Sequence, residues 1–402
     1  MYRITYWLLY GHYSYSLALG ILRFRYDFNN HKAHTTPFNT YYSIVMNVLT
    51  LTTLPWIYYT AVHTFLQNER VGRLVLYVFI ATKTLRLLAV ALAIIYNWQR
   101  RYEVLTVIRD INHLRSDYFA RFRVPSEWQR RFEMKIIKNM LSGVLVDASG
   151  LITVFGVYEN QMSASFIISN VLFSLISNIL YLIMNQYYFA IRTVILFGNM
   201  LNHQLADIIK SAKTVARLRD CPGSRTQFKA RCLTLCRELD ELAMVRTQLQ
   251  SLALRINDIL KWQGLGVLIN MFILNISLIY TIYSMLWVGG FTICQYGWVS
   301  VLMGVSYVVY IVDMKDFLGA ILEHVGVFHK TSLYLELHTN LPQLDKVFEQ
   351  SVESFQLQLS LNKYQLSLLG LLNFNSECVF SMFASVIVNS ILMIQFDYQY
   401  FQ

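Results

Sequence analysis

Charged residues are scarce in this chain of 402 residues. Only 14% of them are Asp, Glu, Lys or Arg, whereas 55% are hydrophobic and 15% are aromatic. Soluble domains carry about 25% charged and about 45–50% apolar residues. Together with a mean hydropathy of +0.40, this composition excludes an ordinary soluble protein and predicts a polytopic membrane protein.

Proline, glycine and cysteine are also few. Five prolines and 17 glycines leave little room for a disordered linker. Of the five cysteines, Cys232 and Cys236 are spaced to share one face of a helix, but no second Cys or His pair lies nearby in sequence. A structural metal site needs about four such ligands. We therefore interpret both cysteines as reduced structural thiols and predict no metal site.

Catalytic motifs are missing as well. The sequence contains no HExxH, no GxSxG and no Gly-rich phosphate loop, which are the common signatures of zinc proteases, hydrolases and nucleotide enzymes. His324 and His329 are five residues apart, so they do not share a helix face as two metal ligands at i and i+4 would. The sequence predicts neither an enzyme nor a bound cofactor.

We expect no secretory leader in the first residues. Residues 4–22 are apolar in part, but Gly11 and His12 interrupt them, and Arg23 and Arg25 follow on the wrong side for a signal peptide. We interpret this segment as a tyrosine-rich helix at the membrane surface or in the cytosol. A first membrane span is the alternative.

Seven stretches have the roughly 20 mostly apolar residues that a membrane-spanning helix needs. They are residues 41–66, 71–97, 139–157, 165–190, 265–289, 293–312 and 376–396. Three long polar stretches, 98–138, 191–264 and 313–375, alternate with short connections, so all three lie on one side. The sequence therefore predicts an all-α fold with seven transmembrane helices.

The basic residues indicate the orientation of these helices. Thirty of the 34 lysines and arginines lie in residues 1–40 and in the three long polar stretches. The positive-inside rule places the N-terminus in the cytosol and the C-terminus outside, which is opposite to a G-protein-coupled receptor. Because the net charge of +10 is spread over membrane-proximal loops, it favours membrane lipid over nucleic acid as the partner.

The long polar stretches carry helical patterns of their own. Apolar residues recur every three to four positions from Leu233 to Ile259 and again near residues 344–361. These helices pack on one another or on neighbouring subunits. The expected layout is a cytosolic segment (1–40), a six-helix transmembrane region (41–312), a cytosolic helical anchor (313–375), and a seventh helix with a short extracellular tail (376–402).

Three charged residues lie inside predicted spans. Lys83 and Arg86 are in the second span and Asp147 is in the third. Lys83 and Asp147 lie at similar depth, and intramembrane charges are usually paired or face water. We predict a Lys83–Asp147 ion pair with Arg86 as a competing partner. Such a pair either holds helices together or lines a polar ligand cavity.

Aromatic residues gather in the outer halves of the spans. They are Tyr77, Phe155, Tyr158, Phe173, Tyr280, Tyr283, Trp287 and Tyr307. Two interpretations stay open: an interfacial aromatic belt, or a ligand pocket in which aromatic rings surround a few polar groups.

The last predicted helix contains two amides, Asn389 and Gln395, which are costly in hydrocarbon without a partner or water. Asn389, Leu392, Gln395 and Phe396 are related by spacings of three and four, so they form one stripe. A stripe of this kind is expected to face water.

The stretch LSLLGLLNFNSECVFSMFASVIVNSILMIQF, residues 366–396, resembles the C-terminal end of the insect gustatory receptors. Gly370, Leu371 and Leu372 fit the first part of the family pattern, Asn375 fits its polar break, and Gln395-Phe396 fit its end. The Thr-Tyr of the family signature falls on Val388 and Asn389, so this half of the signature is missing. The rest of the chain also agrees with this family in its length, its seven predicted spans, its inside N-terminus and its short outside tail.

The resemblance implies a ligand-gated, non-selective cation channel in the plasma membrane of a sensory dendrite. It would be a tetramer, alone or with other gustatory receptors, opened by a small-molecule tastant bound among the outer halves of spans two to six. The implied pore-lining residues are Val388, Asn389, Leu392, Gln395, Phe396 and, at the outer mouth, Asp397. The alternative is a seven-span receptor that signals through a cytosolic partner without its own pore; a transporter or membrane enzyme fits less well.

Overall fold

The structure is a computed structural model that describes residues 3–28, 32–66, 73–122, 124–157, 164–218, 225–287, 293–336, 345–368, 372–373 and 375–400. The helices are α1 (Arg3–Ala18), α2 (Pro37–Leu66), α3 (Arg73–Gln99), α4 (Arg101–Asp117), α5 (Ser126–Val157), α6 (Ala164–Leu218), α7 (Arg225–Trp287), α8 (Ile293–Glu336), α9 (Lys346–Leu361) and α10 (Ser376–Tyr400), with a 3-10 turn η1 (Phe119–Arg121). Two small antiparallel hairpins pair β1 (Phe24–Asp27) with β2 (Lys32–Thr35) and β3 (Ser367–Leu368) with β4 (Leu372–Asn373).

The helical fold class is confirmed. As far as the chain is described, each predicted span lies within a single helix: α2, α3, α5, α6, α7, α8 and α10 in turn. By length and composition alone, four described helices are apolar enough to cross a membrane: α3, α6, α7 and α10. The number of spans and the orientation of the termini therefore stay predictions.

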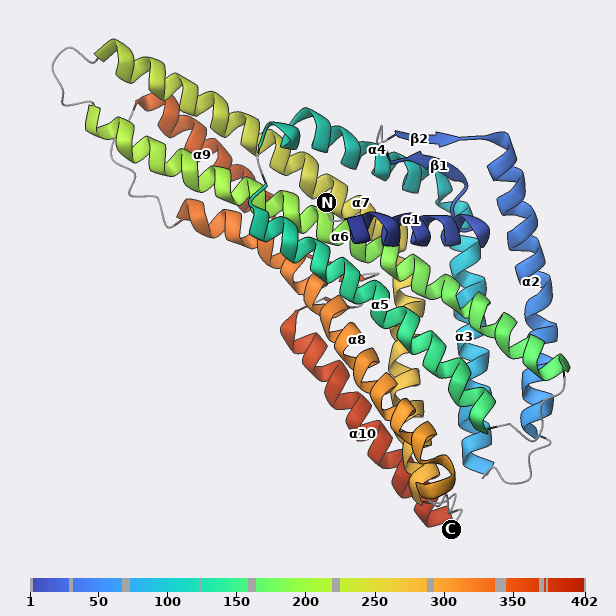
Figure 1. Ribbon diagram of the computed structural model, residues 1–402. Helices are drawn as coiled ribbons and strands as arrows, with labels where there is room; N and C mark the ends of the chain where they lie inside the picture. The colour runs from blue at the N-terminus through green and yellow to red at the C-terminus, as the bar shows by residue number, and fades with distance from the viewer. Residues whose placement is uncertain are drawn as a thin grey trace.

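Three helices continue far beyond the predicted spans, as the patterns in the polar stretches indicated. α6 has 55 residues and α7 has 63. In Figure 1 the C-terminal half of α6 and the N-terminal half of α7 run side by side with α9 and the C-terminal end of α8. Together they form an arm that leads away from α2 and α3. Leu239, Leu242 and Leu249 are almost completely buried in the core of this arm, and Cys232 and Cys236 are buried there as free thiols.

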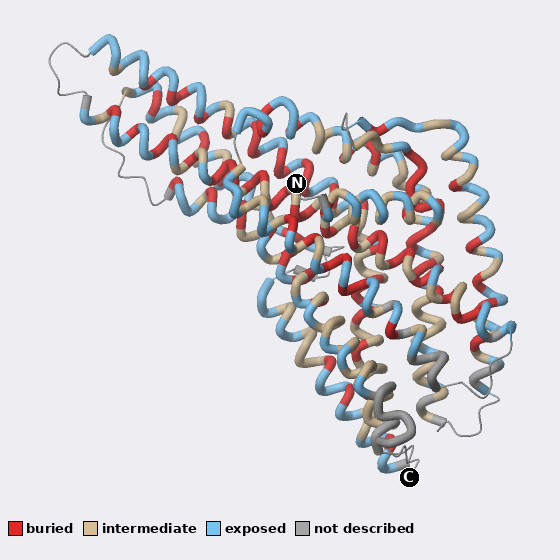
Figure 2. Tube along the Cα trace, in the orientation of Figure 1, coloured by how far each residue is buried: buried red, intermediate tan, exposed pale blue. Residues whose placement is uncertain are grey.

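A second core lies in the body of the molecule, between α2, α3, α6, α7 and α8. Its large, fully buried side chains include Ile57, Ile179 and Tyr188. Figure 2 shows the buried residues along the inner sides of these helices, while the outer sides and most of α10 are exposed.

The close approach of α6 and α8 requires a glycine at Gly198. A Cβ there would lie 2.3 Å from Cγ1 of Val327, a contact that real Cβ atoms do not make. Val327 is 2% exposed, and its β-branched side chain has little freedom to rotate away. Its backbone is also held, because Asn202 Nδ2 donates a hydrogen bond of 3.0 Å to the Val327 carbonyl.

Gly198→Ala is therefore expected to destabilise the protein by about 1–3 kcal/mol through overpacking. The melting temperature of the purified protein measures this. Gly326→Ala on the facing helix is the matched control, since nothing lies within 4 Å of a Cβ at Gly326. Equal melting temperatures for the two variants would contradict this account of the α6–α8 contact.

α1 is the tyrosine-rich helix predicted for the N-terminal segment, but its polarity is reversed relative to a water-soluble amphipathic helix. Its inner side is polar: Thr5 Oγ1 donates a hydrogen bond of 3.1 Å to Glu133, and Asn178 donates one of 3.3 Å to Tyr15. Its outer side exposes Ile4 and Trp7, at 64% and 58%. An apolar outer face favours contact with lipid over contact with cytosol.

Candidate functional site: the exposed face of the last helix

α10 packs on the rest of the chain along one narrow stripe. Val386, Ser390 and Asp397 are buried on this stripe at 7%, 2% and 6% exposure, and Val379 and Phe383 pack against the body core. These positions repeat every three to four residues, as one face of a helix does. Only 11% of the apolar window of α10 is buried, against 28–56% for the other three apolar helices.

The opposite face of α10 carries the residues predicted to line a pore. Val388 and Leu392 are each 54% exposed and Phe396 is 48% exposed; Asn389 and Gln395 are exposed as well. Asn389 Nδ2 donates a hydrogen bond of 2.7 Å to the Ser385 carbonyl, one turn earlier. An apolar helix face that includes two amides is unfavourable against lipid, so this face is suited to water or to a polar partner surface.

The structure places Asp397 elsewhere than expected. It is 6% exposed and lies on the packed side of α10, near Tyr280 on α7, whose buried hydroxyl has no hydrogen-bond partner in the described chain. The reason is helical geometry: Asp397 is seven residues beyond the buried Ser390, which puts both on the same face. Asp397 therefore does not share the exposed stripe with Gln395.

Asp397 lies near one of the predicted aromatic residues, Tyr280 on α7. Tyr280 is fully buried, and its ring centroid lies 6.3 Å from that of Tyr283, one turn further along α7. Tyr307 on α8 is half-buried. Two of the predicted aromatic residues are thus adjacent on α7, and Tyr280 lies near Asp397 of α10.

The other predicted aromatic residues do not share one environment. Phe173 is buried on α6, whereas Tyr77 is 61% exposed and lies outside the core. Tyr158 and the side chains of Phe155 and Trp287 are outside the described residues.

The predicted intramembrane charges meet one of these rings. Lys83 Nζ lies 3.5 Å from the ring centroid of Phe173, and Arg86 Cζ lies 5.7 Å from it. A desolvated cation over an aromatic face is stabilised by about 2 kcal/mol. The side chain of Asp147 lies outside the described residues, so the Lys83–Asp147 pair stays a prediction. The two cations and the predicted ligand-binding Phe173 do come together.

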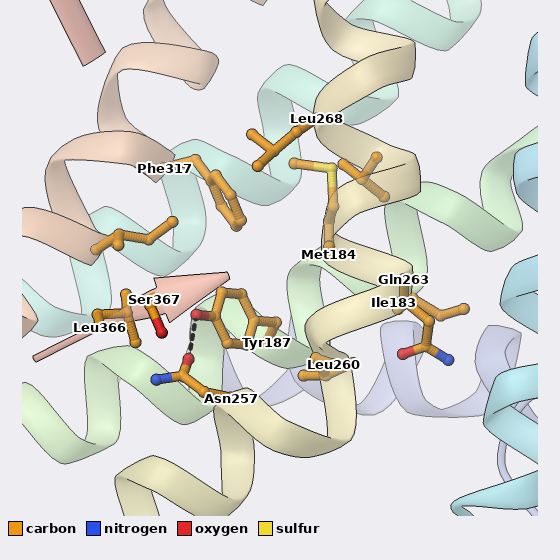
Figure 3. Close-up of a pocket in the computed structure, with 13 residues that line it drawn as sticks. Ile183, Met184, Tyr187, Asn257, Leu260, Gln263, Leu268, Phe317, Leu366 and Ser367 are labelled. Carbon is orange, nitrogen blue, oxygen red and sulfur yellow. Dashed lines mark hydrogen bonds between the residues drawn. The ribbon is translucent and has the colours of Figure 1, made fainter. Parts of the chain in front are cut away.

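Sequence reasoning missed a half-buried polar cluster around Tyr364, which precedes β3. Tyr187 donates a hydrogen bond of 2.6 Å to Asn257, and Asn257 donates one of 3.3 Å to the hydroxyl of Tyr364. Figure 3 shows the first of these bonds next to Leu366 and Ser367. The residues come from α6, α7 and the segment before β3, so no local pattern could have grouped them.

The cluster borders a small cavity and a buried histidine. The cavity, of about 40 Å³, is lined mainly by apolar residues of α6, α7 and α8, which is room for a few waters and not for a tastant. His324 contacts the Tyr364 hydroxyl at 3.4 Å. Burial lowers the pKa of His324 to about 4, so its ring is neutral at physiological pH. These contacts hold Tyr364 against α7 and α8.

Comparison with known proteins covers nearly the whole chain. The model of the family described as 7tm Chemosensory receptor matches residues 9–400. Among Drosophila melanogaster homologues named as gustatory receptors, 36b is 24% identical over 96% of each chain, and 59d is 23% identical over 97% of each chain.

Solved structures share the fold. The insect olfactory receptor OR5 from Machilis hrabei in complex with eugenol has a TM-score of 0.55 with 10% identity, covering 97% of this chain and 99% of that one. The structure of the same receptor described without eugenol gives a TM-score of 0.54 with 11% identity, at 96% and 97% coverage. At such identities the likeness establishes the fold alone.

Proposed function

The chain belongs to the 7tm chemosensory receptor family, and on this premise we propose that it is a ligand-gated, non-selective cation channel opened by a small-molecule tastant. Because the family is one of receptors, the prediction that the chain is not an enzyme is confirmed. Family membership and the apolar helices likewise indicate a membrane protein. The channel, its ligand and its assembly belong to the proposal.

The observation that carries the proposal is the exposed face of α10. In the monomer this helix buries only 11% of its apolar window, and its open face presents Asn389 and Gln395 between Val388, Leu392 and Phe396. Four copies around a central axis would turn this face toward a water-filled pore. There the amides would contact passing cations, and the apolar side chains would form a hydrophobic gate.

We place the tastant site in the helix body, around Phe173, Tyr280, Tyr283 and Tyr307. Support comes from the adjacent rings of Tyr280 and Tyr283 and from the cations that lie over the Phe173 ring. A structural neighbour has been solved in complex with eugenol, a small molecule. Because α10 packs on α7, with Asp397 near Tyr280, a ligand-induced shift of α7 would act directly on α10.

The proposed assembly is a homotetramer or a tetramer with related receptors, with each subunit crossing the plasma membrane of a sensory dendrite seven times. The N-terminus would be cytosolic and the C-terminus extracellular. The arm of α6, α7, α8 and α9 would then lie in the cytosol, where the basic residues of the long polar stretches are concentrated.

The experiment that tests this function is current recording from purified protein in a synthetic bilayer. A library of sugars, bitter compounds and volatile aromatics is applied with no nucleotide and no other protein present, alongside an empty bilayer as control. We expect a ligand-dependent cation current. A protein that binds ligand in a thermal-shift assay but never conducts would instead be a receptor that signals through a cytosolic partner.

A further inference from the structure

A buried guanidinium lies where the N-terminal segment meets α3 and α4. Arg23 precedes β1 and is 6% exposed, and its Nε and Nη2 atoms are buried without a hydrogen-bond partner in the described chain. The residues on both sides of Arg23 in the chain are held in place. Asn97 Nδ2 donates a hydrogen bond of 2.8 Å to the Ile21 carbonyl, and Leu22 and Phe24 pack in a small core with α4. Burying two guanidinium nitrogens without hydrogen-bond partners is costly, so this arrangement indicates an anionic ligand.

A second guanidinium shares the same aromatic neighbour. Arg23 Cζ lies 4.2 Å from the ring centroid of Tyr102, and Arg101 Cζ lies 5.1 Å from it and 4.1 Å from the ring of Trp98. Stacking on rings fixes both guanidinium planes but does not neutralise their charges.

The neighbouring Arg100 gives the contrast. It makes ion pairs with Glu103 at 2.8 Å and Asp258 at 3.2 Å, whereas in the part of the chain that is described neither Arg23 nor Arg101 has a carboxylate within ion-pair distance. The local potential is correspondingly positive: the guanidiniums of Arg23 and Arg101 lower the pKa of the Tyr102 hydroxyl.

The two guanidiniums lie at the end of α3, a helix that also carries an exposed apolar stripe. Leu88, Leu92 and Ile95 are 58%, 50% and 44% exposed, and their spacing places them on one side of α3. The predicted second span ends at residue 97. In Figure 1 the chain turns at this point from α3 into α4, beside the β1–β2 hairpin. This is the depth at which the phosphates of one leaflet meet a spanning helix.

We propose that Arg23, Arg101 and Tyr102 bind the phosphate of an anionic phospholipid, whose acyl chains run along Leu88, Leu92 and Ile95. Guanidinium groups form paired, charge-assisted hydrogen bonds to phosphate oxygens, and the Tyr102 hydroxyl adds a donor. The exposed apolar stripe on the helix that ends at the site favours a lipid over a soluble phosphate. The bound lipid would thus link the N-terminal segment, through Arg23, to the α3–α4 turn, through Arg101.

The test measures phospholipid binding to the purified full chain by native mass spectrometry, with phosphatidylglycerol as the probe and phosphatidylcholine as its zwitterionic counterpart. The wild type is expected to retain phosphatidylglycerol selectively. Arg23→Gln and Arg101→Gln are each expected to weaken that binding roughly tenfold, as the loss of a charged hydrogen-bond pair does. Arg109→Gln, which removes an exposed positive charge from α4, is the matched control and should bind as the wild type does.

Two further readouts keep the test decisive. The melting temperature in phosphatidylcholine shows whether Arg23→Gln is folded; if it is not, Arg101→Gln, a half-buried position, decides alone. Competition with glycerol 3-phosphate separates the two sources of phosphate. Full displacement by this soluble ester, equal retention of both lipids, or equal weakening by Arg109→Gln would each overturn the proposal.

Discussion

Replacing Gln395 with glutamate is expected to raise the permeability of divalent relative to monovalent cations several-fold and to introduce block by divalent ions. Gln395 is exposed on the face of α10 opposite the packed stripe. In the proposed tetramer four copies would face one another across the axis. Four carboxylates in a narrow ring concentrate cations, and divalent ions most of all. Reversal potentials and block curves for the activated channel measure the effect.

Asp397→Asn supplies the matched control two residues along the same helix. It also changes local charge, but Asp397 is buried on the side of α10 that packs on α7, near Tyr280. Relative permeability should therefore stay at the wild-type value, while the ligand concentration for half-maximal opening shifts. If Gln395→Glu and Gln395→Ala both leave selectivity and block unchanged, the exposed face of α10 does not line the pore.

The exposed stripe of α10 was predictable because its signal is local. Asn389, Leu392 and Gln395 are grouped by helical periodicity alone, and the amides mark the group as unsuited to lipid. The long helices of the arm were predictable for the same reason, since Leu239, Leu242 and Leu249 repeat with the period of a helix and are buried together.

Features that depend on partners distant in sequence were not predictable. Asp397 follows Phe396 directly and reads as part of the same polar end, but the heptad spacing from Ser390 turns it toward α7. Arg23 reads as an ordinary cytosolic arginine; its burial depends on a hairpin that packs on α4. The reversed polarity of α1 likewise depends on Glu133 and Asn178, which come from α5 and α6.

The ion pairs between α5, α6 and α8 also join residues distant in sequence, so they too were not predictable. Glu323 on α8 accepts hydrogen bonds from Arg192 on α6 and from Lys135 on α5, the latter at 3.2 Å. The side chain of Arg192 is 5% exposed, while those of Glu323 and Lys135 are 41% and 43% exposed. Removing the carboxylate leaves the buried Arg192 guanidinium without its ion-pair partner.

Glu323→Gln is therefore expected to destabilise the protein by about 2 kcal/mol. This is less than the ~3–5 kcal/mol cost of breaking a fully buried pair, because water reaches Glu323 and screens its charge. A double variant, Arg192→Met with Glu323→Leu, should be more stable than Glu323→Gln, since it leaves no buried charge unpaired. Melting temperatures of the purified variants compare them, and Glu349→Gln at an exposed position of α9 is the control.

The pH dependence of stability provides a second signature of this network. Burial of Glu323 opposes its charged form, but Arg192 and Lys135 outweigh that effect and hold the pKa of the Glu323 carboxyl below its ordinary value of 4.5. A lowered folded-state pKa contributes stability above the unfolded pKa, and this contribution is lost as the pH falls through the folded-state value. The difference in melting temperature between wild type and Glu323→Gln should thus be largest near pH 7 and shrink below about pH 4.5. A difference that stays constant from pH 7 to pH 3.5 would show that Glu323 acts through packing and not through its charge.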